Sequence, residues 1–266
     1  MAENTQLAEQ KKEVAVKPFK EALTESLADA QMALPENFNV TRFVLNCDSI
    51  LRENETLSKF IKSHPGDGII QAKKGMLKGA FLGLDFMQSE AYLIPYGDTL
   101  TFMPSYTGKV KLCKRYSTRP IRDIYSRIVR EGDELIEKVV DGKPSIDFIP
   151  KPFNTRDIIG AFAVVIYQDG GIDYETMSIG ELEQVRKSSK MGTTGAWKAY
   201  TSEMYRKTVL RRLTKHIDLN FDSSEQAQYF NEDTDIETDV RTQAEAEIAE
   251  NANMIPFDDE VIEGNA

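Results

Sequence analysis

The sequence is poor in the residues that build metal sites and disulfide frameworks, with two cysteines and two histidines among 266 residues. Cys47 and Cys113 lie far from each other and from any Cys-x-x-Cys spacing, and neither His64 nor His216 has a cysteine at ligand spacing. We therefore expect two inert thiols in a reducing compartment, no protein metal site and no cofactor.

Long apolar runs are also missing. No stretch of about 18 apolar residues occurs. The first 17 residues, MAENTQLAEQKKEVAVK, hold no apolar signal segment. The sequence therefore predicts no membrane partner and a cytoplasmic location.

The net charge of −10 is concentrated at one end of the chain. From Asp222 to the C-terminus, 14 Asp and Glu residues accompany one Arg, a balance of −13, so residues 1–221 carry +3. An acidic segment with few apolar residues is typical of disorder. We expect a flexible N-terminal arm over residues 1–35, one core domain over 36–221, and an acidic, disordered tail over 222–266.

Against this acidic total, residues 186–215 hold nine basic residues and one acid, Glu203. At helical periodicity from Trp197 onward, the apolar residues fall on one side and can pack on a core. This apolar side consists of Tyr205, Val209, Leu210, Leu213 and Ile217. The opposite side consists of Trp197, Met204, Lys207, Thr208, Arg211 and Lys215.

A helix face that combines cations with an aromatic ring suits a polyanion whose bases can stack, because Lys and Arg displace counterions from phosphates and rings accept any base. The alternative is a solvated charged face with Trp197 packed in the core. Like charges one turn apart, such as Lys207 and Arg211, repel each other unless an anion lies across them. The clustering therefore favours the nucleic-acid interpretation.

A second basic segment, residues 105–130, holds eight basic residues and one acid, Asp123. It begins after a hairpin expected at 91–106 around a Gly97-Asp98 turn. Val110, Leu112 and Cys113 can face inward in its first part. Its cations, expected to extend outward, are Lys109, Lys111, Lys114 and Arg115.

The remaining pattern mixes helices with strands. Helical spacing is found over 41–63 and over 69–84, where three glycines four residues apart permit close packing against a sheet. Strands are expected at 121–129, 134–140, 145–149, 158–168 and 172–177, with turns at Asp141-Gly142 and Asp169-Gly170-Gly171. Ser178 and Glu181 form a capping box that begins a further helix.

Several of these segments, taken in order over residues 69–219, resemble the RecT branch of phage single-strand annealing proteins. Three motifs carry the resemblance: Tyr106, Gly108 and Leu112 in one run, Arg-Glu-Gly-Asp at residues 130–133, and the helix over 197–212. Each motif alone is weak, and their collinearity makes a chance match improbable.

The resemblance implies an α+β fold, in which a curved, mostly antiparallel β-sheet packs against helices as in the eukaryotic strand-annealing mediators. The implied activity is binding of single-stranded DNA, pairing with its complement and limited strand exchange in phage-type homologous recombination, without ATP and without enzymatic chemistry. Implied partners are further copies in rings or filaments, a phage exonuclease and a host single-strand-binding protein, in a bacterial host or encoded by a prophage. Magnesium is expected only to modulate DNA binding.

We predict that the two basic segments line one groove, which screens two phosphate backbones from each other. One wall consists of Lys109, Lys111, Lys114 and Arg115, the other of Lys198, Lys207, Arg211 and Lys215, and Arg186, Lys187 and Lys190 lie near the mouth. Tyr106 and Trp197 are candidates to support bases, and a core position is the alternative for both.

Two other functions compete with annealing. A magnesium-dependent nuclease would use the carboxylates Glu131, Asp133, Glu134 and Glu137 with Lys138, although their strand-like spacing makes alternate side chains diverge. A sequence-specific helix-turn-helix regulator would use the helices over 181–215 on duplex DNA. Lys and Arg outnumber the Asn and Gln that this second function needs for reading base edges.

Overall fold

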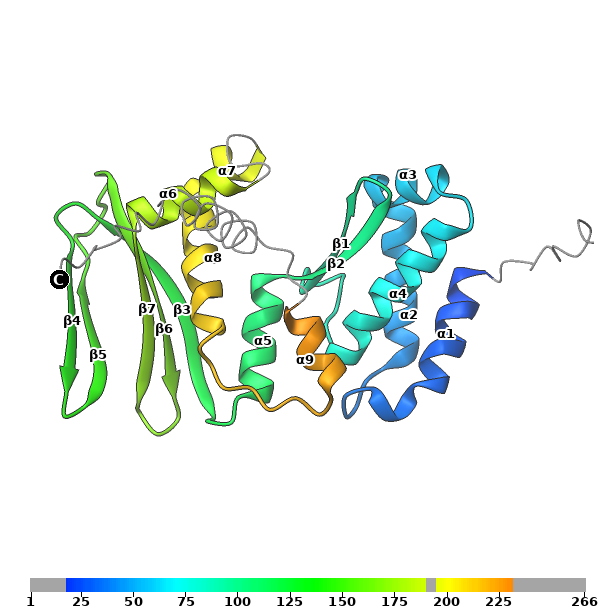
Figure 1. Cartoon of the computed structure of the whole chain (residues 1–266), viewed down its shortest axis with the longest axis horizontal. Helices are drawn as coiled ribbons and strands as arrows, with labels where there is room; N and C mark the ends of the chain where they lie inside the picture. Colours follow the sequence, from blue (N-terminus) through cyan, green and yellow to red (C-terminus); the bar gives the residue numbers. More distant parts are fainter. Residues whose placement is uncertain (1–17, 190–194, 232–266) are drawn as a thin grey trace, which may run out of the picture. The chain divides into compact units, whose positions relative to one another are not determined.

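The computed structural model describes residues 18–189 and 195–231 of the chain (Figure 1). These residues form two compact units. The first unit holds residues 18–116 and 219–231, and the second holds residues 117–189 and 195–218. The chain therefore leaves the first unit after Tyr116 and returns to it at Leu219.

The first unit is mainly helical. Its helices are α1 (Phe19–Asp29), the short 3-10 helix η1 (Gln31–Ala33), α2 (Val40–Glu53), α3 (Glu55–Ser63), α4 (Asp67–Leu82), α5 (Tyr106–Tyr116) and α9 (Ser224–Asn231). Its strands β1 (Ala91–Tyr96) and β2 (Thr99–Pro104) form the expected antiparallel hairpin. Asn39 and Asn54 cap α2 and α3 through their side chains, which explains why the segment over 41–63 divides into two helices.

The glycines of α4 allow close packing, as their spacing predicted. A Cβ atom on Gly75 would lie 2.4 Å from Cδ2 of Leu93 on β1, and one on Gly79 would lie 2.5 Å from Cε2 of Phe86. Gly75 therefore lets the hairpin approach the helix, and Gly79 leaves room for the ring of Phe86, which precedes the hairpin. Gly83, with φ +64°, ends the helix in the left-handed conformation.

Both expected domain boundaries fall inside this first unit. Leu23 and Leu27 lie one helical turn apart on α1 and are fully buried where α1 packs on α2 and α4. At the other end, Phe230 of α9 is buried, and Gln226 donates from Nε2 to the Phe81 carbonyl at 2.9 Å. Apolar residues within polar segments are sufficient to dock both helices. The rest of the predicted arm and tail, residues 1–17 and 232–266, lies outside the described residues.

The second unit is built on antiparallel strands. Its elements are β3 (Ile121–Arg130), β4 (Glu134–Val140), β5 (Lys143–Ile149), β6 (Ile158–Tyr167), β7 (Ile172–Ser178), α6 (Ile179–Ser188), α7 (Gly195–Ala199) and α8 (Thr201–Thr214). β3, β6 and β7 form one sheet with β6 in the centre, and β4 pairs with β5 as a separate hairpin. The capping box at Ser178 and Glu181 is present, as predicted. Antiparallel sheets packed against helices confirm the predicted α+β class.

The central strand β6 is buried on both faces. Phe162 and Val164 share a core with Val129, against which Phe148 and Leu135 of the β4–β5 hairpin pack. Side chains alternate along a strand, so Ala161, Ala163 and Val165 point to the other face, where α8 packs. The second unit is therefore layered as hairpin, sheet and helix, and small side chains let α8 lie close to the sheet.

The predicted orientation of the basic segment over residues 105–130 is wrong for Lys109. Residues 106–116 form helix α5, in which Lys109 shares a face with Leu112, Cys113 and Tyr116. That face is buried, and Lys109 is only 3% exposed. The alternating pattern of this segment suggested an inward and an outward side for an extended chain, whereas the helical period places the amine with the apolar residues.

Candidate nucleic-acid interface

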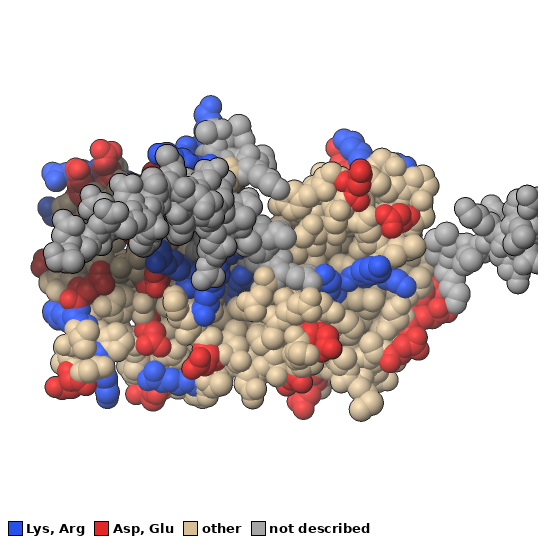
Figure 2. Space-filling model, viewed as in Figure 1, with Lys and Arg blue, Asp and Glu red and all other residues tan. Residues whose placement is uncertain are grey.

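Helix α8 has the two faces that its sequence predicts. Tyr205, Val209, Leu210 and Leu213 are buried, as is Ile217 just after the helix. Lys207, Arg211 and Lys215 follow each other at four-residue steps on the other face, where Lys207 and Lys215 are exposed and Arg211 is half-buried. In Figure 2, Lys and Arg side chains gather over the part of the second unit where Figure 1 draws α8. The helix thus presents Lys207 and Lys215 outward, whereas Nε and Nη2 of Arg211 between them are buried.

Arg212 of α8 pairs with carboxylates of neighbouring elements. Arg212 turns toward β7 and α6, where its Nε lies 2.7 Å from Oε1 of Glu175 and its Nη1 lies 3.2 Å from Oε1 of Glu181. The hydrogen bonds of Ser178 and the guanidinium of Arg212 hold the pKa of Glu181 below its usual value, although burial opposes them. Arg212 therefore connects α8 to β7 and α6.

Trp197 lies in the core, as the alternative to base stacking proposed. Its ring is 3% exposed and packs edge-to-face on Tyr205 with 6.0 Å between centroids. Its indole N–H donates to Oγ of Ser189 at 3.1 Å. A ring enclosed in this way cannot stack on a base, so the predicted nucleic-acid role of Trp197 has no support in the geometry.

The cations predicted near the groove mouth differ from one another. Arg186 bonds through Nη1 to Oε1 of Glu183 at 3.1 Å, and Glu183 also accepts from the Tyr205 hydroxyl. This network ties α6 to α8. Lys187 and Lys198 are exposed. Lys190 lies outside the described residues.

In the first unit, two predicted cations stabilise the end of α4. Lys111 donates to the Gly83 carbonyl at 3.1 Å and pairs with Oε2 of Glu90 at 2.6 Å. Arg115 donates from Nη1 to the Leu82 carbonyl at 3.3 Å. Cations near a helix C-terminus complement its partial negative charge and satisfy its last carbonyls. These contacts give both residues a structural task.

The other predicted residues of α5 differ in solvent exposure, since Lys109 is buried. The amine of Lys109 lies 5.3 Å from the centroid of the Phe230 ring. Lys114 and Tyr106 are exposed, Tyr106 at 42%. The predicted common groove joins side chains of the two units and stays a prediction.

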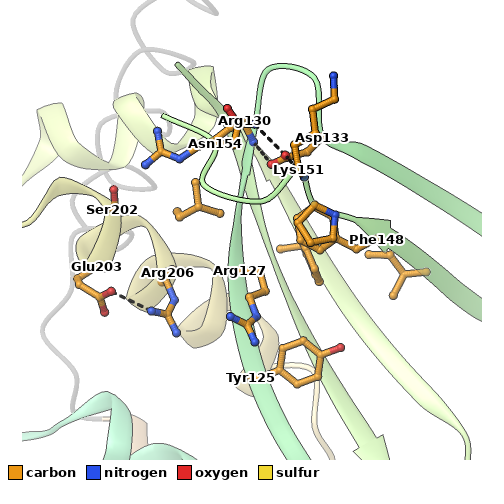
Figure 3. A pocket seen from close by; sticks show the side chains of 14 residues that line it. Tyr125, Arg127, Arg130, Asp133, Phe148, Lys151, Asn154, Ser202, Glu203 and Arg206 are labelled. Atoms are coloured by element: carbon orange, nitrogen blue, oxygen red, sulfur yellow. Dashed lines mark hydrogen bonds and ion pairs between the residues drawn. The ribbon is translucent and has the colours of Figure 1, made fainter. Parts of the chain in front are cut away.

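Sequence reasoning missed a cavity of about 690 Å³ within the second unit (Figure 3). It lies beside β3, the edge strand of the sheet, and it is lined by four cations and three aromatic rings: Arg127, Arg130, Lys151, Arg206, Tyr125, Phe148 and Phe162. Arg127 and Arg130 were counted in one basic segment and Arg206 in the other. Nothing in the sequence indicates that they meet, since the cavity brings together positions about 80 residues apart.

The Arg-Glu-Gly-Asp motif builds one wall of this cavity. Gly132 makes the turn with φ +83°. The Asp133 carboxylate accepts hydrogen bonds from the backbone N–H groups of Arg130 at 2.8 Å and Lys151 at 2.9 Å, and from the amide of Asn154 at 2.8 Å. Burial raises the pKa of Asp133, but these bonds outweigh it and hold the pKa below its usual value. The motif therefore fastens the 150–154 loop to the end of β3.

Arg206 closes the cavity from the helix side. Its Nε donates to the Ser126 carbonyl on β3 at 3.2 Å, and its Nη1 pairs with Oε1 of Glu203 at 2.8 Å. Figure 3 shows Arg127, Arg206 and Tyr125 at one end of the cavity, with Arg130, Asp133, Lys151 and Asn154 at the other.

Potential metal ligands and thiols are sparse among the described residues. Over residues 18–189 and 195–231, no group of three or more His, Cys, Asp or Glu side chains could hold a metal ion. Both thiols are buried, which raises the pKa of Cys47 and raises that of Cys113 to about 12. No helix in these residues is long and apolar enough to cross a membrane.

Comparison with known proteins agrees with the motifs. Residues 73–247 match the model of the RecT family, which is about two thirds of the chain. The chain is also 29% identical to Protein RecT of Escherichia coli (strain K12) over 202 residues, which cover 71% of each chain. The matched residues include α5, the Arg-Glu-Gly-Asp turn and α8. The chain belongs to the RecT family.

Proposed function

We propose that the chain binds single-stranded DNA along the outer face of α8 and pairs the strand with its complement, without a nucleotide and without a resident metal. The family gives the general role, because RecT proteins act in recombination by annealing single strands rather than as classical enzymes. The observation that carries the proposal is the row of Lys207, Arg211 and Lys215 on a helix whose opposite face is anchored in the sheet.

The spacing of this row suits a phosphate backbone. Four residues rise about 6 Å along an α-helix, so the three cations span about 12 Å. Cations at such steps neutralise several phosphates of one strand, which lowers the repulsion that a second strand meets. Because α8 is packed on the sheet, the cations are held in place before DNA arrives, and less ordering is needed on binding.

The row contacts backbone rather than sequence. Helix α8 contains no Asn or Gln, the side chains that read adenine edges in duplex DNA. Sequence is then read by base pairing between the two strands, and the pairing and stacking of the new duplex supply the free energy. Stacking is worth about 1.4 kcal/mol per step. No catalytic side chain is required. The lack of Asn and Gln on α8 also disfavours a helix-turn-helix regulator, which would read base edges.

The test is an annealing assay with two complementary oligonucleotides that carry a donor and an acceptor dye. We expect the full chain to accelerate pairing above the protein-free rate in EDTA and without nucleotide, with no further gain from ATP. A requirement for ATP, or no acceleration, would contradict the proposal. Labelled strands incubated with magnesium should stay intact, and strands cut under these conditions would favour the nuclease instead.

Self-association belongs to the same proposal. Rings or filaments would place many α8 rows along one strand, and each added contact would raise avidity without new chemistry. Electron microscopy of the protein with and without oligonucleotide tests this expectation. A phage exonuclease and a host single-strand-binding protein remain proposed partners, magnesium a proposed modulator, and the cytoplasm the proposed compartment.

A further inference from the structure

The cavity beside β3 lies in the second unit but is distinct from the α8 row, since Arg206 points to the sheet edge and Lys207 to the outer face. Its volume of about 690 Å³ falls in the range of sites that enclose small ligands, about 300–1,000 Å³. The chain's own hydrogen bonds to Asp133 hold this wall in place, so the site is pre-organised.

Its charge favours an anion. Four cations line the cavity against two carboxylates, and both carboxylates are already occupied by hydrogen bonds or an ion pair. Arg127 is exposed, and its guanidinium makes no hydrogen bond or ion pair within the part of the chain that the structure describes. Guanidinium groups match the geometry of phosphate oxygens.

The cavity also offers a surface for a base. The Tyr125 ring, 36% exposed, stands next to Arg127 at one end, and Phe148 continues the apolar lining. Rings accept any base by stacking, which is independent of sequence. Asn154 is the only amide side chain of the lining, and it is engaged with the Glu131 carbonyl, Asp133 and the Arg156 N–H. It therefore cannot read a base edge.

We propose that this cavity binds one unstacked nucleotide of the single strand, with the phosphate on Arg127 and Arg206 and the base against Tyr125. The inference rests on the proposed function and deepens it: the α8 row holds the backbone, and the cavity takes one base out of the stack. A strand held with an interrupted stack exposes neighbouring bases to a complement at lower cost.

The first experiment measures binding of labelled oligothymidylate to the full chain over a range of salt concentrations. For Arg127→Ala we expect weaker binding and a salt slope reduced by about 0.7, the value for one phosphate contact on a single strand. Arg122→Ala is the matched control, because it removes the same exposed charge from the same strand outside the cavity. Its slope should equal that of the unmodified chain. Equal slopes for the two variants would overturn the phosphate contact.

The second experiment tests the base. Tyr125→Ala should weaken binding at least about fivefold, the lower limit for one stacked base, and Tyr125→Phe should restore it. With an oligomer of abasic units, all three proteins should bind alike. A Tyr125→Ala defect that persists on the abasic oligomer, or no defect on oligothymidylate, would overturn base binding. If the unmodified chain binds no single strand at all, the proposed function itself fails.

Discussion

The two units each carry a basic helix, and the helices differ in what their cations do. On α5, Lys109 is buried, while Lys111 and Arg115 bond to the last carbonyls of α4. On α8, Lys207 and Lys215 extend from the face opposite the core. The similar charge of the two segments thus hides two functions, one in which cations hold helices together and one in which they face outward.

The difference follows from the faces that each helix buries. Helix α8 places its apolar residues on one side and its cations on the other, so packing on the sheet leaves the cations outside. On α5 the buried face includes a lysine, and two more cations lie within reach of the exposed end of α4. Charge counted along a sequence therefore does not separate structural cations from binding cations.

The largest effect is expected from the core of the first unit. Leu23→Ala should lower the free energy of unfolding by about 2–5 kcal/mol, because it opens a cavity around a fully buried side chain of α1. Leu45→Ala removes the same atoms from a side chain that is 46% exposed and should cost about 0.5 kcal/mol or less. Chemical denaturation followed by circular dichroism measures both. Equal losses would mean that α1 belongs to a loose arm after all.

A comparable effect is expected on DNA affinity from the second unit. Replacing Lys207, Arg211 and Lys215 together by Ala should weaken binding to single strands on the order of 100-fold, if each cation contributes about 1 kcal/mol. The salt slope should fall by about 2, or about 0.7 for each contact. Fluorescence of Trp197, the single tryptophan, checks that the second unit stays folded. An unchanged slope would exclude α8 as the phosphate-binding row.

For α5 we expect a loss of stability with little change in DNA affinity. Lys111→Met should lower the free energy of unfolding by about 1–2 kcal/mol, because Glu90, 12% exposed, loses its cationic partner and keeps only the Asp85 N–H. Affinity for single strands should change less than twofold. The control is Lys114→Met, an exposed lysine on the same helix, which should leave stability within about 0.5 kcal/mol. A loss of affinity without a loss of stability for Lys111→Met would place α5 in the binding surface.

The smallest effect concerns a pH-dependent contact in the first unit. His64 donates from Nδ1 to the Phe60 carbonyl at 2.9 Å, and its Nε2 lies 3.2 Å from Oδ1 of Asp98. The Phe60 carbonyl, followed by Asp98, raises the pKa of His64 above its ordinary value of about 6.5. The raised pKa stabilises the folded state fully below about pH 6.5, and this contribution is lost as pH rises through the folded-state pKa.

Unfolding measured between about pH 6 and pH 8.5 should therefore show stability that declines with pH in the unmodified chain, and a flatter profile for His64→Gln. Asp98→Asn keeps a hydrogen-bonding partner without its charge and should give an intermediate profile. The second unit, followed by Trp197 fluorescence, should not respond to either change. Identical pH profiles for all three proteins would contradict a stabilising contact made by protonated His64.

The strands and most helices followed from local sequence. Apolar segments bounded by turn signals identified β3, β6 and β7, the Gly97-Asp98 turn identified the hairpin, and the capping box marked the start of α6. These features depend on neighbours within a few residues, so one sequence is sufficient to predict them. The same holds for the two faces of α8, because its apolar residues recur at one period.

Tertiary structure alone decided which cations are available. Burial of Lys109, capping of α4 by Lys111 and enclosure of Trp197 depend on packing partners that are distant in sequence. The cavity depends on this most of all, since β3, the 150–154 loop and α8 each supply one part of its lining. Sequence by itself determined how much positive charge the protein carries and where most of its helices and strands lie, α5 and α9 excepted. Only long-range packing decided where that charge is exposed, because a side chain's environment is set by all the elements around it.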